Sequence, residues 1–420
     1  MRCFAALLFF TASLSCVGQT TASSDVVTVD RAIREALEKN LSLLAERYNV
    51  SVADARIVQA RLRPNPVLSL GLDYQNFLGE DWTPGNQGPQ EWNARVDYQI
   101  ERGGKRARRV EVAQEVKEVA RLELLNTTRG LVLDVENAFL DVQAARDALD
   151  LAKANLASLE EIARINGDRV RAGDLAKVEM IRSRVAALQA RTAVTGAELK
   201  LRTAKSHLQL LLGRPTLSES FDVAGEIRHD EPLVMPDDLK ADAFHLRPDL
   251  LALQRDQARS QADLRLQIAQ GKIDYTFGVE YHHQYDLIHG DALGFFFSAP
   301  IPIFNRNQGE IERARQEDHQ IETRIKAMQA QIANEVINAY QQYASSRTLL
   351  QSIEKDAIPE AKDVRQITEY SYKRGEASLL EFLDAQRAFN DTMQTYNDAR
   401  ADYARSLYLL DSVSGRGINP

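Results

Sequence analysis

One long unit is repeated twice along the chain. Matching residues lie 207 positions apart in the first part of each copy and 202 positions apart in the later part. They are Leu43, Leu44, Ala45, Ala55, Gly71 and Tyr74, repeated as Leu250, Leu251, Ala252, Ala262, Gly278 and Tyr281, and Gly173, Glu179, Leu208 and Gly213, repeated as Gly375, Glu381, Leu410 and Gly415. A fixed period indicates a duplicated unit that folds in the same way twice. We place the copies at residues 28–213 and 237–415, joined by a linker at 214–236.

The first residues have the features of a secretory signal. The apolar run Phe4–Phe10 follows a basic residue and precedes small residues, and it is too short to cross about 30 Å of hydrocarbon. We therefore predict a signal peptide over residues 1–18. Two readings of its end stay open: acylation of Cys16 after a lipoprotein signal, or ordinary cleavage near Gly18 or Ala22.

Composition excludes several classes of protein. With 44% hydrophobic residues and a mean hydropathy of −0.36, the chain is too polar to be a bundle of membrane-spanning helices. Acidic residues outnumber basic ones by 60 to 52, and the basic run at 105–109 is expected to meet lipid headgroups or solvent, so nucleic acid is not an expected partner. The mature chain keeps at most one cysteine, which excludes an internal disulfide and a thiolate metal site. We expect neither a bound metal nor a cofactor.

Helical periodicity covers most of both copies. The predicted helices span residues 30–61, 105–169, 175–212, 309–372 and 378–410. Thr28 is expected to cap the first helix, and Pro359 to kink or break the second long one. Each long helix has about 60 residues, or roughly 90 Å at 1.5 Å per residue. The long helices and their return partners predict two helical hairpins with Gly173 and Gly375 at the tips.

Four short segments change the period to two. Apolar and polar residues alternate over about nine or ten positions in each, which predicts amphipathic strands long enough to cross an outer membrane when tilted. They form two hairpins, at about 67–101 and 273–302. The lumen-facing polar side would carry Asp73, Arg95, Asp97, Asp274, Glu280 and His282. Carboxylates outnumber Arg95 on this side, which predicts a mild preference for cations.

Four strands cannot close a barrel in lipid, because an open edge leaves backbone groups unpaired at several kcal/mol each. The barrel must therefore be shared between chains. Two chains would give eight strands with a filled interior, and three would give twelve strands with a lumen that can carry solutes. Backbone pairing allows a barrel of two or of three chains, and a function in transport favours three.

Three motifs carry a resemblance to a known family. They are RPDLLAL at 247–253, IPIFNRNQGEI at 301–311 and YKRGEASLLEFLDAQ at 372–386. The chain resembles the TolC-type outer-membrane efflux proteins over nearly its whole mature length, especially the branch that exports heavy metals and other small solutes. The resemblance implies a mainly α fold with a small β part. A long antiparallel α-helical barrel would continue a transmembrane β-barrel of twelve strands, shared by a homotrimer.

The resemblance also implies a function without catalysis. The chain would be an outer-membrane exit duct with a long periplasmic helical part, receiving metal ions, drugs or small organic solutes from a periplasmic adaptor protein and an inner-membrane transporter of the RND type. The duct of a type I protein secretion system is the alternative that the resemblance leaves open.

Family site residues map onto the tips of the helical hairpins. The periplasmic gate would comprise Tyr372, Glu179, Glu381 and Asp384. The last two would form an acidic ring in a trimer, with raised pKa values and affinity for cations. Ala377 occupies the place of the family's basic gate partner, for which Lys373 or Arg374 is a substitute. The adaptor-docking tips would be Gly173, Asp174, Leu175, Gly375, Glu376 and Leu379.

Two other classes of protein compete with a duct. An enzyme with a di-metal site in a helical bundle needs Glu-x-x-His pairs on facing helices, but the pairs here fall in the linker, at Glu226, and in a strand, at Glu280. We therefore predict that the chain is not an enzyme. A periplasmic coiled-coil scaffold would explain the long helices, but it leaves four apolar strand faces without an environment.

Overall fold

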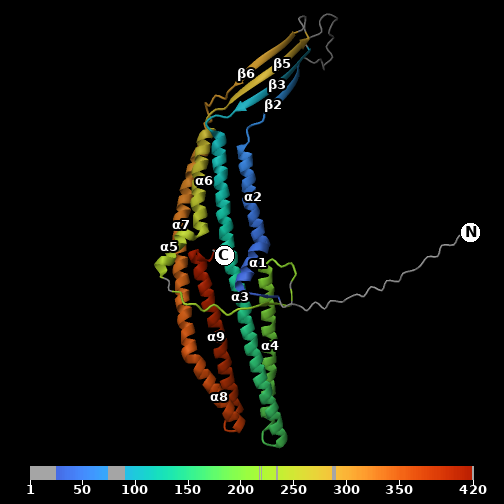
Figure 1. Cartoon of the computed structure of the whole chain (residues 1–420), viewed down its shortest axis with the longest axis vertical. Coiled ribbons are helices and arrows are strands. Elements are labelled where there is room, and N and C mark those ends of the chain that lie inside the picture. The colour runs from blue at the N-terminus through green and yellow to red at the C-terminus, as the bar shows by residue number, and fades with distance from the viewer. Residues whose placement is uncertain are drawn as a thin grey trace, which may run out of the picture.

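The molecule is elongated, with a sheet at one end and two long helical hairpins reaching the other (Figure 1). This computed structural model describes residues 25–73, 90–216, 218, 220–232, 235–285 and 290–418. The predicted signal peptide, Cys16 and Tyr74 lie outside the described residues. No helix among the described residues combines the length and apolar character needed to cross a membrane.

Both halves of the chain contain matching elements in the same order, except that the single long helix α3 corresponds to two helices, α7 and α8, in the second half. The first half comprises α1 (Val29–Lys39), α2 (Leu41–Arg61), β2 (Val67–Asp73), β3 (Gln90–Ile100), α3 (Lys105–Ala172) and α4 (Lys177–Leu211). The second half comprises α5 (Pro236–Leu246), α6 (Pro248–Gln270), β5 (Tyr275–Tyr285), β6 (Gly290–Ser298), α7 (Gln308–Ser352), α8 (Ile358–Arg374) and α9 (Leu379–Ser414). The longest helix, α3, has 68 residues and is therefore about 100 Å long. The predicted class, mainly α with a small β part, is confirmed.

The first predicted helix, 30–61, is wrong in one respect, because the structure breaks it at Asn40. The Asn40 side chain accepts a hydrogen bond from the Leu43 amide at 3.0 Å, which caps α2, and donates to the Leu211 carbonyl at 2.9 Å. Thr28 precedes α1 but makes no side-chain cap. The second half breaks at the matching position, Arg247, and α6 begins directly after it.

Two short strands form a small second sheet near the middle of the molecule. β1 (Asp25–Val27) pairs in parallel with β4 (Phe221–Val223), and the side chains of Val27 and Phe221 are fully buried beside α1 and α4. β4 lies inside the predicted linker at 214–236, so part of that linker belongs to the core. Strands of three residues are too short to show an alternating pattern in the sequence.

The second long helix is interrupted near Pro359, as predicted. A π-helical turn, Ile353–Ala357, separates α7 from α8, and Pro359 lies in the first turn of α8. Proline has no backbone N–H and its ring collides with the preceding turn of a regular helix. The wider π turn provides the room that this ring needs.

The two predicted hairpins form one antiparallel sheet in the order β2-β3-β5-β6. Its apolar side chains, such as Leu70 and Phe295, share one face and are 74% and 81% exposed. Among the described residues, β2 and β6 each pair along one side only. The sheet therefore has an uncovered apolar face and two open edges.

The helices form a layer that is one helix thick. Near the sheet, α3 lies between α2 and α6, and α7 packs on α6; beyond the middle, α3 lies between α4 and α9, while α7 and α8 pack on α9 (Figure 1). The long helix α3 thus joins both regions. The two edges of the layer are α2 and α7 near the sheet, and α4 and α8 toward the tips.

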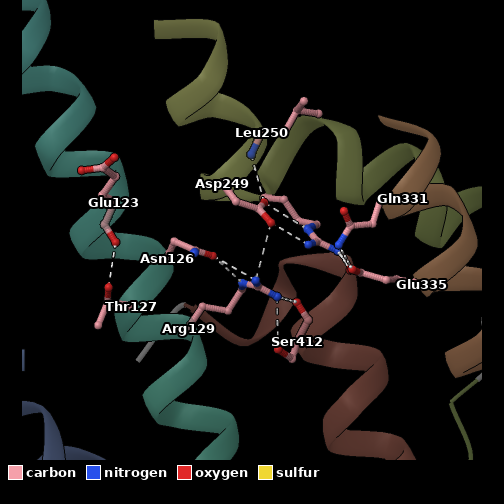
Figure 2. A network of polar contacts seen from close by, with 10 residues as sticks. Glu123, Asn126, Thr127, Arg129, Asp249, Leu250, Gln331, Glu335 and Ser412 are labelled. Carbon is pink, nitrogen blue, oxygen red and sulfur yellow. Dashed lines mark hydrogen bonds and ion pairs between the residues drawn. The ribbon is translucent and has the colours of Figure 1, made fainter. Parts of the chain in front are cut away.

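A buried polar network fixes the break between α5 and α6 (Figure 2). Arg247 is only 3% exposed; it bonds Asp249 at 2.6 Å and also pairs with Glu335 of α7. Arg129 of α3 lies 3.8 Å from Asp249 and donates to the Ser412 carbonyl of α9 at 3.0 Å. The RPDLLAL motif therefore marks the place where the break between α5 and α6 is tied to α3, α7 and α9.

We predict that Asp249→Asn destabilises the protein by about 3 kcal/mol, because it leaves two buried arginines without their shared carboxylate. Burial opposes ionisation of Asp249, but the bonds from Arg247 and the charge of Arg129 hold its pKa below the usual range. A lowered pKa stabilises the fold above the unfolded-state value near 3.8, so this contribution disappears as the pH falls below it. Thermal unfolding of detergent-extracted protein at pH 7 and below pH 3 measures both effects.

Asp54→Asn is the matched control, because Asp54 pairs with Lys117 on an exposed surface. Equal losses of thermal stability in the two variants would contradict a central role for the buried network.

Candidate functional site

A glycine lies at the tip of each helical hairpin. Gly173 follows α3 with φ of 89°, and Gly375 follows α8 with φ of 81°, a region that side chains other than glycine rarely adopt. Their amides donate to carbonyls in the last turn of the preceding helix, which closes both helix ends in the same way. The two tips therefore have matching backbone geometry.

Aromatic and aliphatic residues hold the two hairpins together at their tips. Tyr372 of α8 is 3% exposed and stacks on Phe382 of α9, with ring centroids 5.5 Å apart. Both rings belong to a buried cluster with Leu159 and Ile162 of α3. This cluster links the first half of the chain to the second half at the end farthest from the sheet.

Two polar contacts connect α3 to α8 beside this cluster. The Tyr372 hydroxyl donates to Asn166 Oδ1 at 2.6 Å, and burial raises the pKa of Tyr372. The Arg169 guanidinium donates to the Lys373 carbonyl at 2.7 Å and lies 5.9 Å from the centre of the Tyr372 ring. A basic side chain from α3 therefore lies beside Tyr372, whereas Ala377, in the turn between α8 and α9, stands where the resemblance implies a basic partner.

Sequence reasoning missed Asn166 and Arg169. Asn166 follows Ile162 by four positions, on the stripe of α3 that is otherwise apolar, and its side chain is fully buried. A polar residue on a buried stripe is a detectable signal, because it requires a partner. The identity of that partner, 206 residues away, is not evident from the sequence.

The predicted gate carboxylates occupy three different environments. Glu381 forms a capping box with Ser378, whose amide and hydroxyl donate to it at 2.7 and 2.9 Å, and these bonds lower the pKa of Glu381 within one protomer. Asp384, one turn later, is exposed and makes no hydrogen bond or ion pair with the described residues. Glu179 pairs with Arg182 at 3.1 Å.

The predicted docking residues are mostly at the surface. Gly173, Asp174, Gly375 and Glu376 are exposed, and Leu175 is half-buried. Leu379 is different, because it is buried in the tip cluster, whereas the next residue, Leu380, is exposed.

A groove that the sequence does not reveal runs between α4 and α9, over α3. Its two parts have volumes of about 580 and 540 Å³ and share Asn155, Ala193 and Asn390 as lining residues, so they are continuous. Small side chains such as Ala148 and Gly196 form the wall of the part nearer the middle of the molecule. Val178 and Ile181 line the part nearer the tip.

The polar face of the sheet carries the predicted lumen-facing residues, and several are paired. Asn93 donates to Asp73 at 3.1 Å, Arg95 bonds Asp97 at 2.8 Å, and His282 lies 3.2 Å from Glu91. Asp274 lies just before β5 and bonds Lys105, at 2.7 Å, where the sheet meets α3. The prediction that this basic run meets lipid headgroups or solvent is therefore wrong for Lys105, which is buried. Its positive charge offsets the negative charge of Asp274, one of the predicted lumen-facing carboxylates.

The comparisons with known proteins agree with this architecture. A model of the outer membrane efflux protein family matches residues 32–214 and again residues 241–416, which follow the two halves of the chain. The chain belongs to the outer membrane efflux protein family. Its predicted family and its outer-membrane location are therefore confirmed.

Relatives and solved structures match over most of their length. The cobalt-zinc-cadmium resistance protein CzcC of Cupriavidus metallidurans is 23% identical over 390 residues, which cover 93% of this chain and 90% of CzcC. The outer-membrane channel OprN superposes with a TM-score of 0.76 at 17% identity, over 93% of this chain and 91% of OprN. CusC, a transmembrane channel, gives 0.76 at 18% identity over 92% of each chain. These superpositions show that the fold of this chain is that of outer-membrane channels.

We predict that Tyr372→Phe loosens the tip, because it leaves the buried Asn166 side chain without its partner. Loss of a hydrogen bond worth about 1.4 kcal/mol corresponds to an about tenfold larger equilibrium population of the locally open tip, and so to faster amide exchange there. Hydrogen exchange of peptides from the ends of α3 and α8, followed by mass spectrometry, measures this change. Tyr370→Phe is the control, since Tyr370 lies on the same helix but is 56% exposed. Unchanged exchange in Tyr372→Phe would show that the hydroxyl contact does not hold the tip closed.

Proposed function

We propose that three copies of this chain form the outer-membrane exit duct of a tripartite efflux system, which conducts small solutes passively. The observation that carries the proposal is the four-stranded sheet, with one apolar face, one polar face and two open edges. In lipid such edges must be paired, so the sheet requires copies of itself. Twelve strands from three chains enclose a lumen, whereas eight strands are filled by their own side chains.

The edges of the helical layer support the same assembly. The edge helix α4 exposes a stripe of apolar residues spaced at threes and fours, and the edge helix α8 exposes another. The stripes comprise Val178, Ile181, Val185 and Leu188 on α4, and Val364, Ile367 and Tyr370 on α8. Contact between α4 of one copy and α8 of the next would bury both stripes and close the layer into a tube that continues the barrel.

The tip contacts are proposed as the periplasmic gate in its closed state. Tyr372 with Asn166, and Arg169 with the Lys373 carbonyl, hold α8 against α3. In a trimer, Glu381 and Asp384 would recur three times around the axis and form a cation-binding ring, with Glu179 as a further acidic group. Opening would then require α8 to leave α3, and the π turn before α8 is the natural place for it to bend.

The partners are a periplasmic adaptor and an inner-membrane transporter of the RND type. We place the adaptor at the exposed tips and along the part of the groove nearer the middle of the molecule, whose small side chains suit an incoming helix. The similarity to a cobalt-zinc-cadmium resistance protein supports divalent metal ions as the first solutes to test. Drugs and small organic solutes are the next candidates.

Single-channel recording of the detergent-extracted protein in a planar bilayer tests the proposed duct. We expect a small, mostly closed conductance from the wild type and a severalfold larger one from the double variant Arg169→Ala, Tyr372→Phe. The control is Arg171→Ala, Tyr48→Phe, which removes an exposed guanidinium beside the gate and an exposed hydroxyl on α2. A folded, membrane-inserted assembly that conducts in neither form would contradict the duct and favour a scaffold.

Ile367→Glu tests the proposed contact between copies. A charge in the apolar stripe of α8 should shift the detergent-extracted protein from trimers to single chains, because burying it unpaired costs several kcal/mol. Lys362→Glu is the control, since Lys362 lies on another exposed side of α8. Size-exclusion chromatography with light scattering measures the masses, and an intact Ile367→Glu trimer would exclude this stripe from the interface.

A further inference from the structure

The centre of the polar sheet face contains an ion pair that the strand register does not favour. Arg95 of β3 and Glu280 of β5 are direct cross-strand neighbours. Opposite charges in this position usually pair. Here Arg95 instead bonds Asp97 of its own strand, at 2.8 Å from Nη2 and 3.0 Å from Nε. Glu280 makes no hydrogen bond or ion pair within the described parts of the chain.

Contacts with Asp97 and Phe296 hold the Arg95 side chain away from Glu280. The Arg95 side chain crosses β5 diagonally, over Gly278, and its guanidinium carbon lies 4.1 Å from the centre of the Phe296 ring on β6. Gly278 is the register partner of Asp97 on β3 and of Phe296 on β6, so these three residues lie in one row across the strands. The guanidinium therefore has a carboxylate on one side and an aromatic face on another.

The missing side chain at Gly278 makes this path possible. A Cβ atom built there would lie 3.0 Å from Arg95 Nε and nearer still to Asp97 Oδ1. Any larger residue at 278 would displace the Arg95–Asp97 pair. The direct cross-strand neighbour, Glu280, is then the nearest alternative partner for the guanidinium.

We propose that Glu280 is the residue that sets charge selectivity in the barrel, and that Gly278 and Phe296 act as positioning residues that keep Arg95 from neutralising it. This inference rests on the proposed duct. The Arg95–Asp97 pair adds no net charge, so each chain contributes one uncompensated Glu280 carboxylate at the middle of the sheet. In a trimer, three such carboxylates would attract cations and repel anions at one level of the lumen.

Reversal potentials in a potassium chloride gradient test the proposal with reconstituted wild-type and variant protein. We expect Glu280→Gln to lower the ratio of potassium to chloride permeability by about twofold or more. Gly278→Ala should lower the ratio in the same direction although it changes no charge, because Arg95 is pushed toward Glu280. In the Glu280→Gln background, Gly278→Ala should have no further effect.

Phe296→Leu gives an independent test if alanine at 278 prevents barrel assembly. It removes the aromatic support of Arg95 and should also lower the ratio, whereas Phe295→Leu, on the opposite face of the same strand, should not. Wild-type selectivity in Glu280→Gln, or in both Gly278→Ala and Phe296→Leu, would overturn the inference and leave the duct intact. Absence of any wild-type pore would overturn the proposed duct and this inference together.

Discussion

Unpaired backbone groups at the two edges of a four-stranded sheet are the constraint on which the rest of this structure depends. One face of the sheet is apolar and uncovered, so it requires lipid, and lipid offers no hydrogen bonds to an open edge. The proposed duct satisfies both demands by pairing the edges of each chain with those of other copies. The same holds for the helices, because a layer one helix thick has two edges that the described residues leave uncovered.

The long helix α3 changes its neighbouring helices at the middle of the molecule. α1 and α5 end at Asn40 and Arg247, where α2 and α6 begin, while α3 continues past both breaks. Asn40 bonds the end of α4, and Arg247 bonds α7, so each break is tied to the helices beside it. The arrangement lets α3 pack on α2 and α6 near the membrane and on α4 and α9 toward the tips.

Most of the fold could be predicted from the sequence because its elements are long and periodic. The strand alternation around Val96 and Val279, and the apolar stripes of the long helices, specify both the elements and their exposed faces. The break at Asn40 was missed because the apolar period continues through it, and β1 and β4 because three residues define no period. The tip contacts depend on residues about 200 positions apart, which only the folded chain brings together.

The mass of the intact complex tests a shared barrel most directly. Native mass spectrometry of the protein released from detergent counts the chains without relying on conductance or on variants. The account predicts three copies of the mature chain, which supply twelve strands and a lumen. A stable assembly of two copies would supply eight strands and a filled interior, and a folded single chain would leave its edges open, so either result would contradict it.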